Sequence, residues 1–118
     1  MAGEEAFDLR VIGELQDQIG AEAMQDILRR LTANGGLLIP VILDAGQPIG
    51  ERTEAAHSLK GACAVVGMSR LAAFCQEIET AWGDGLNDQA ERLAAGLPAL
   101  FAADREQLAR FFLAPPAA

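Results

Sequence analysis

The sequence predicts an all-α fold, namely an antiparallel up-down four-helix bundle with an additional short N-terminal helix. Hydrophobic residues make up 51% of the 118-residue chain and aromatic residues only 5%, and alanine and leucine dominate the apolar set. This composition favours helices that pack closely through small side chains. Apolar residues recur at helical spacing in five segments, and no segment shows the alternation that is typical of a strand. Short links between the segments place successive helices antiparallel.

The first two helices are expected on either side of Gly20. Asp8 can cap a short helix, because its carboxylate can accept hydrogen bonds from backbone N–H groups in the first turn. The inward positions of this helix are Ile12 and Leu15, and Gly20 ends it. The apolar spacing resumes near Ala21, where the second helix begins.

The segment TANGGLLIP, residues 32–40, interrupts the pattern of the second helix. Gly35, Gly36 and Pro40 all disfavour a regular helix. Either the helix stops near Asn34 and a new one starts, or one long helix is kinked here. We expect the kinked helix, because LLIPVILDA resumes the apolar pattern at once.

Three more helices follow, separated by turn signals. Pro48 suits the first turn of the third helix, and the apolar pattern of that helix runs to Val66. Gly67 fits the position after its C-terminus, where a left-handed backbone is common. Ser69 can cap the fourth helix and Asn87 the last one.

The whole chain, residues 1–118, is expected to form one helical domain, since no linker is long enough to divide it. Pro98 should bend the last helix, because proline cannot donate the backbone hydrogen bond of a helix interior. The tail 114–118, with its two prolines, is expected to be disordered.

Charge and cysteine content exclude several classes of protein. The formal net charge of −8 disfavours binding to nucleic acid, which requires a basic face. Cys63 and Cys75 lie outside any CxxC pattern, so two buried reduced thiols are expected rather than a disulfide. The start MAGEEAFDLR lacks the features of a signal peptide. No run approaches the roughly 18 apolar residues of a membrane span, and we expect a cytoplasmic protein.

The stretch HSLKGACAVVG, residues 57–67, contains the only histidine of the chain. At about 100° per residue, His57 lies off the apolar stripe of its helix, and Gly61, Ala64 and Met68 follow it on the same outer face. Lys60 can lean toward the imidazole. A glycine inside a helix costs about 1 kcal/mol relative to alanine, so Gly61 indicates a need for space. Such a face suits an incoming anion or a docking protein.

This stretch and the following LAAFCQEIE resemble the histidine-containing phosphotransfer (HPt) domain family. The family's motif has a histidine, then leucine at +2, lysine at +3 and glycine at +4 and +10. These positions are His57, Leu59, Lys60, Gly61 and Gly67. Leucine, cysteine and glutamate of the family's next helix are matched by Leu71, Cys75 and Glu79.

The resemblance implies a phosphorelay carrier. His57 would accept a phosphoryl group from the aspartate of a receiver domain, or from a kinase, and pass it to another receiver aspartate. An unperturbed imidazole is mostly neutral, and therefore nucleophilic, at neutral pH. Lys60 would neutralise charge on the phosphoryl oxygens, and Gly61 would leave room for them. Mg²⁺ is expected on the partner receiver and no cofactor on this chain.

The resemblance also implies that receiver domains of response regulators or hybrid kinases dock on the second and third helices. Ala64 and Met68 are candidates near the histidine. Leu37, Leu38 and Val41 are further candidates, for which core packing is the alternative.

An independent enzyme is not expected. With one histidine there is no second imidazole base and no histidine-rich zinc site, and neither GxxxxGK[ST] nor GxGxxG is present to bind ATP. A kinase dimerisation domain would be a two-helix hairpin, whereas five helical segments indicate a monomer. A helical module that docks on a kinase or regulator without phosphotransfer is the alternative function.

Overall fold

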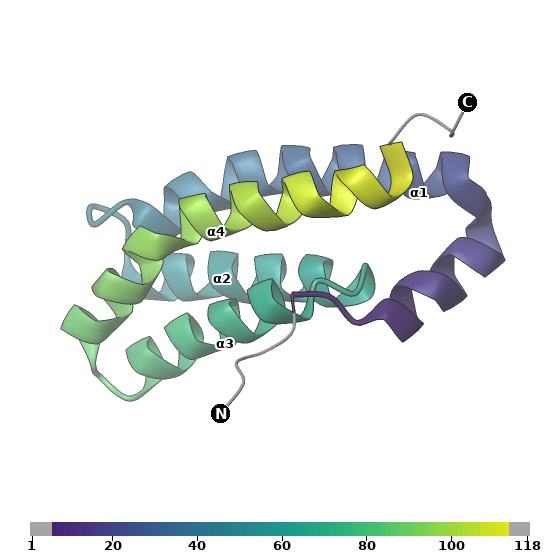
Figure 1. Cartoon of the computed structure of the whole chain (residues 1–118). Helices are drawn as coiled ribbons and strands as arrows, with labels where there is room; N and C mark the ends of the chain where they lie inside the picture. The colour runs from purple at the N-terminus through teal and green to yellow at the C-terminus, as the bar shows by residue number, and fades with distance from the viewer. Residues whose placement is uncertain (1–5, 114–118) are drawn as a thin grey trace.

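A computed structural model describes residues 6–113 of the chain, so the expected disorder of the tail 114–118 lies outside the described residues. Within them the protein is all-helical. Its four helices are α1 (Leu9–Leu43), α2 (Ile49–Val65), α3 (Ser69–Gly83) and α4 (Asn87–Leu113). Each helix packs against the next, and α1 also packs against α4, so that the four helices form a closed bundle (Figure 1).

The first part of α1 turns away from the rest of the helix at Gly20. Gly20 has φ 84° and ψ 167°, angles that lie outside the helical region. Helical geometry resumes at Ala21 without a loop, so the additional N-terminal helix that the sequence predicts is not a separate element. The predicted break at Gly20 is present as a kink within α1 (Figure 1).

The segment before the kink is attached to the turn between α2 and α3. Asp8 caps α1 as predicted, because its carboxylate accepts from the N–H groups of Arg10 and Val11. The Asp8 N–H donates to the carbonyl of Gly67 at 2.7 Å, and the Arg70 N–H donates to the carbonyl of Ala6 at 3.3 Å.

The glycine-rich stretch in the middle of α1 stays helical. The helix continues through Asn34, Gly35, Gly36 and Pro40, and within α1 only Gly20 has non-helical angles. This confirms one long helix rather than a stop near Asn34, but the non-helical angles that mark a kink lie at Gly20 and not in this segment, where we expected the kink. Gly35 is buried and faces Phe101 of α4, whereas Gly36 is exposed.

The turn between α2 and α3 depends on Gly67, whose φ of 78° lies in the left-handed region, as predicted. A side chain there would also meet the carbonyl oxygen of Asp8 at 3.0 Å. We predicted that Ser69 caps α3, and this prediction is wrong. Ser69 is the first helical residue, and its hydroxyl donates to the Gly67 carbonyl, so that Met68 takes the cap position.

The last helix also starts one residue earlier than predicted. Asn87 is the first residue of α4 rather than its cap. Pro98 lies inside α4, and Figure 1 shows this helix changing direction along its length, as we expect of a helix with an internal proline.

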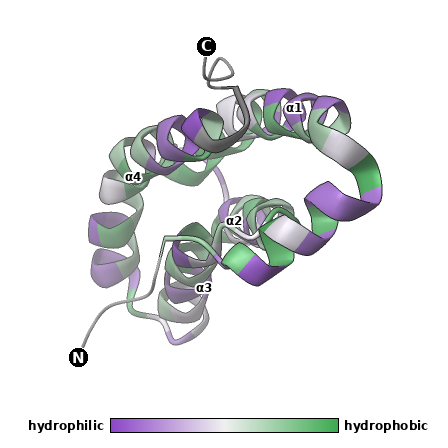
Figure 2. Cartoon of the chain, turned by 45° about the vertical axis from the view of Figure 1, so that its right-hand side comes forward, coloured by the Kyte–Doolittle hydropathy of each residue, from purple (hydrophilic) through white to green (hydrophobic). Residues whose placement is uncertain are grey.

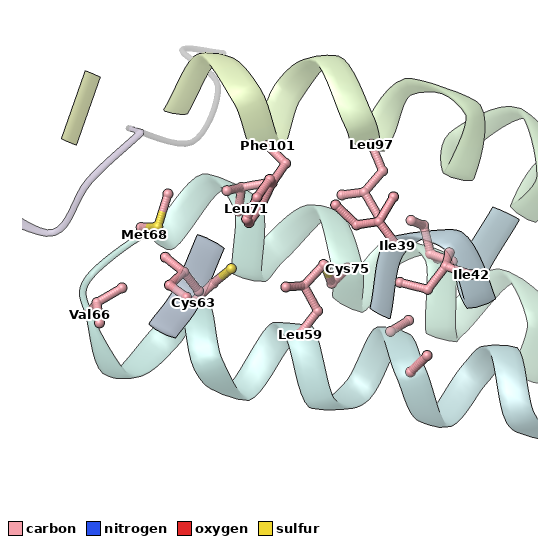
Figure 3. Packing of buried hydrophobic residues seen from close by; sticks show 14 of the residues in the cluster. Ile39, Ile42, Leu59, Cys63, Val66, Met68, Leu71, Cys75, Leu97 and Phe101 are labelled. Carbon is pink, nitrogen blue, oxygen red and sulfur yellow. The ribbon is translucent and has the colours of Figure 1, made fainter. Parts of the chain in front are cut away.

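Apolar side chains from all four helices fill the space between them. Figure 2 shows hydrophilic residues mainly on the outer sides of the helices, and Figure 3 shows core side chains pointing toward one another. Buried members from the four helices are Ile39, Ile42, Leu59, Cys63, Leu71, Cys75, Leu97 and Phe101.

One buried cation ties the start of α2 to the other three helices. Arg52 is only 2% exposed. Its Nε donates to the carbonyl of Ile42 in α1 at 2.9 Å, and its Nη groups donate to both carboxylate oxygens of Glu91 in α4 at 2.5 and 2.7 Å. The guanidinium lies 4.7 Å from the ring centroid of Trp82 in α3. These contacts fix the part of α2 that carries His57.

Candidate functional site

The outer face of α2 presents the predicted histidine to solvent. Leu59 and Cys63 point into the core, and this orientation turns His57 outward with its side chain 66% exposed. Lys60, one turn further along, lies at the edge of the same face and is half-buried.

A carboxylate from α3, that of Glu79, lies between His57 and Lys60 and contacts both. Glu79 is 15% exposed, and its two oxygens have different partners. Oε2 lies 3.1 Å from Nδ1 of His57, and Oε1 lies 3.1 Å from Nζ of Lys60. The Lys60 ammonium also donates to Oε1 of Gln76 at 2.8 Å. Lys60 therefore leans toward α3 and meets the imidazole through Glu79, rather than directly as we expected.

This pairing assigns the roles of the two ring nitrogens. A carboxylate oxygen only accepts hydrogen bonds, so the ring proton belongs on Nδ1, which donates to Glu79. Nε2 then keeps its lone pair and is the nucleophilic atom of His57. Glu79 thus sets both the tautomer and the ring orientation.

Gly61 is exposed, and a side chain added there would meet no atom within 4 Å. Packing within the chain therefore does not require a glycine at this position, although a glycine weakens the helix. The space beside His57 is open to an incoming group.

The two cysteines are not competing nucleophiles. Cys63 and Cys75 are buried free thiols, as predicted. Burial, reinforced by the neighbouring Cys75 and by Asp104, raises the pKa of Cys63 to about 12. Burial and the nearby Glu79 carboxylate raise the pKa of Cys75 to about 12 as well. A thiol with such a pKa has almost no thiolate at neutral pH.

The candidates for docking fall into three groups. Ala64 is exposed on the face of His57, and Leu37 of α1 is 72% exposed. Leu38 and Val41 are half-buried and pack against the core. The prediction of Met68 as a surface residue is wrong: α2 ends at Val65, so Met68 no longer follows the periodicity of α2 and is fully buried.

Three residues of this region were given no role from the sequence, although Glu79 was matched to the glutamate of the family's next helix. Glu79 and Gln76 complete the network around His57 and Lys60, and Val65 is an exposed apolar residue one position beyond Ala64. Glu79 lies in the segment that resembles the HPt family, so its importance could have been predicted from the sequence. Its contacts with His57 and Lys60 could not, because they depend on how α2 and α3 pack.

Residues 6–113 contain no group of three or more His, Cys, Asp or Glu side chains placed to hold a metal ion. None of the helices in this part of the chain is both long and apolar enough to span a bilayer.

Comparison with known proteins adds one finding. The family model of the Hpt domain matches residues 10–110. No curated protein and no solved structure gives a significant match. Because the family model covers most of the chain, from the first part of α1 to near the end of α4, the protein belongs to the Hpt domain family, the histidine phosphotransfer modules of two-component phosphorelays.

Proposed function

We propose that His57 is the phosphoryl carrier of this Hpt domain. It takes the phosphoryl group from the aspartate of a receiver domain, or from a kinase, and passes it to another receiver aspartate. The observation that supports this is an exposed imidazole whose Nδ1 is held by Glu79, which leaves Nε2 as the nucleophilic nitrogen.

The transfer step balances on these atoms. The lone pair of Nε2 forms the N–P bond as the acyl O–P bond of the donor phosphoaspartate breaks, and the bonding electrons stay on the aspartate carboxylate. The ring retains its proton on Nδ1 and becomes positively charged. Glu79 lies 3.1 Å from Nδ1 and stabilises that charge. Transfer to the next receiver reverses the step.

Lys60 and Gly61 support the reacting phosphoryl group in different ways. The Lys60 ammonium is one helical turn from His57 and can offset negative charge that spreads over the phosphoryl oxygens. Its ion pair with Glu79 and its hydrogen bond to Gln76 hold it beside the ring. Gly61 leaves the approach to the ring clear.

The partners follow from this chemistry. The receiver domain brings its own Mg²⁺, and this chain needs neither a cofactor nor ATP. The receiver docks around His57, with contacts to Ala64 and to the exposed Leu37 of α1. Leu38 and Val41 border that surface. We propose that the chain acts as a monomer in the cytoplasm.

The deciding experiment incubates the protein with a phosphorylated receiver domain and Mg²⁺ and follows label on the chain. Label that is acid-labile and base-stable is expected on the wild type and absent from His57→Gln. His57 is exposed, so the variant should fold, and circular dichroism checks this. Equal binding of the receiver to both proteins, with no label on either, would contradict transfer and indicate a docking module without phosphotransfer.

A further inference from the structure

An open hollow of about 550 Å³ lies directly beside His57, between the start of α2 and the end of α3. His57 and Glu79 form one side of it. Ile49 and Thr53 of α2 and Trp82 of α3 line the remainder. The hollow is on the N-terminal side of His57 along α2, away from Ala64, and is therefore separate from the docking residues considered above.

The apolar part of the lining is formed by Ile49 and Trp82. Trp82 is fixed from below by Arg52, whose guanidinium lies 4.7 Å from the ring centroid and is itself held by Glu91 and the Ile42 carbonyl. Ile49 is an exposed apolar residue at the rim. A preformed apolar surface loses little conformational entropy when a ligand covers it, which favours binding.

Two glycines keep the hollow open. Gly50 of α2 and Gly83 of α3 both line it, and an added Cβ would meet no atom within 4 Å at either position. The fold therefore does not require them to be small. A side chain at either site would occupy the hollow without disturbing the helices.

The charge at the rim of the hollow is negative and comes from Glu54, since the Glu79 carboxylate is paired with the Lys60 ammonium. The ionisable lining residues of the hollow are Glu54, His57 and Glu79, and Glu54 is exposed at the rim. Arg52, the nearest guanidinium beneath the wall, is neutralised by Glu91. A complementary surface would present an apolar side chain with a basic residue beside it.

We propose that this hollow receives an apolar side chain of the partner receiver domain, flanked by a lysine or arginine that faces Glu54. The inference rests on the proposed function, because the donor aspartate must reach Nε2 of His57. The protein surface around that aspartate must then cover the adjoining hollow. The hollow thus selects among receivers by the residue next to their phosphorylation site.

The test uses Trp82, the only tryptophan of a chain without tyrosine. Receiver domains that lack tryptophan, loaded with Mg²⁺ and beryllofluoride to mimic the phosphoaspartate, are titrated into the protein while Trp82 emission is recorded. We expect a saturable shift in emission, and we expect Gly50→Leu to raise the Kd by roughly tenfold or more, since its side chain fills the hollow. Gly13→Leu is the matched control. It lies in the N-terminal part of α1, also has no atom within 4 Å of an added Cβ, and should leave the Kd unchanged.

An unchanged Kd for Gly50→Leu overturns the proposal, as does a wild-type chain that binds receivers without any change in Trp82 emission. If instead the emission changes with the concentration of the protein alone, and sedimentation shows a dimer, a second copy of this chain occupies the hollow and the proposal is wrong. Labelling of His57 is scored separately. Loss of binding in Gly50→Leu, with no label on the wild type, supports the hollow and contradicts phosphotransfer.

Discussion

At the scale of single residues, Glu79 holds the only histidine and the only lysine of the chain on the two oxygens of one carboxylate. This arrangement matters because the charge on the imidazole changes during transfer. A neutral ring becomes positive when Nε2 takes a phosphoryl group, and the nearby carboxylate then stabilises it more strongly than before. Glu79 therefore acts on the reaction without touching the phosphoryl group.

We expect Glu79→Gln to slow transfer to His57 by roughly ten- to a hundredfold, because the amide can still accept from Nδ1 but carries no charge. Single-turnover transfer from a phosphorylated receiver measures this rate. Glu77→Gln is the control, since Glu77 is an exposed carboxylate on the same helix. Equal rates in the two variants would show that the charge of Glu79 plays no part, and a loss of helicity would show that its role is structural.

At the scale of helices, two adjacent glycines in α1 have opposite roles. A Cβ at Gly35 would lie within 3.0 Å of three ring carbons of the buried Phe101, whereas a Cβ at Gly36 would meet nothing within 4 Å. Gly35 therefore permits the close approach of α1 and α4. Gly36 weakens the helix and permits no close approach of another helix.

The two alanine variants should accordingly change stability in opposite directions. Gly35→Ala should lower the free energy of unfolding by about 1–3 kcal/mol, because Phe101 must move within a packed core. Gly36→Ala should raise it by up to about 1 kcal/mol through helix propensity. Urea unfolding followed by circular dichroism measures both. If both variants were stabilised equally, the Phe101 ring would be able to move away from Ala at position 35 without a loss of packing energy.

The same glycines show where prediction from sequence ends. Helical spacing predicted the helical segments and the continuity of α1 through Gly35 and Gly36, because periodicity is a local property, but it also predicted a separate helix before Gly20. His57, Lys60 and Gly61 could be found because they lie close together on one helix and their spacing resembles the motif of the HPt family. The contacts of Gly35 and Glu79 depend instead on the packing of two helices and were not predictable. Met68 was misplaced because the periodicity of α2 was extended past its end at Val65.

At the scale of the whole molecule, a chain of net charge −8 places two of its arginines in ion pairs that join helices. Arg70 of α3 binds the buried carboxylate of Asp104 in α4. Arg52 of α2 binds Glu91 in α4, and it also contacts Ile42 in α1 and Trp82 in α3. Breaking either pair leaves its buried member, the Arg52 guanidinium or the Asp104 carboxylate, without its counter-charge, which is costly. The bundle should therefore depend on pH through Glu91, whose carboxylate is held by Arg52.

The Arg52–Glu91 pair determines the direction in which the free energy of unfolding changes with pH. Hydrogen bonds from Arg52 lower the pKa of Glu91 below its ordinary value of 4.5. A carboxyl with a lower pKa in the folded state stabilises the fold above its ordinary pKa, and this contribution disappears as the pH falls through the lowered value. At pH 7 we expect Glu91→Gln to reduce the free energy of unfolding by about 1–2 kcal/mol, a modest figure because Glu91 is 43% exposed and partly screened by water.

Urea unfolding of the wild type and Glu91→Gln between pH 7 and pH 3 should then show a gap that narrows as the wild type is acidified, because the protonated glutamate resembles the amide. Glu14→Gln, which removes an exposed partner of Arg10 within α1, should differ from the wild type by less than about 0.5 kcal/mol at every pH. If the difference in free energy of unfolding stayed constant down to pH 3, Glu91 would act through its shape rather than its charge. If there were no difference at pH 7, the ion pair of Arg52 with Glu91 would not stabilise the bundle.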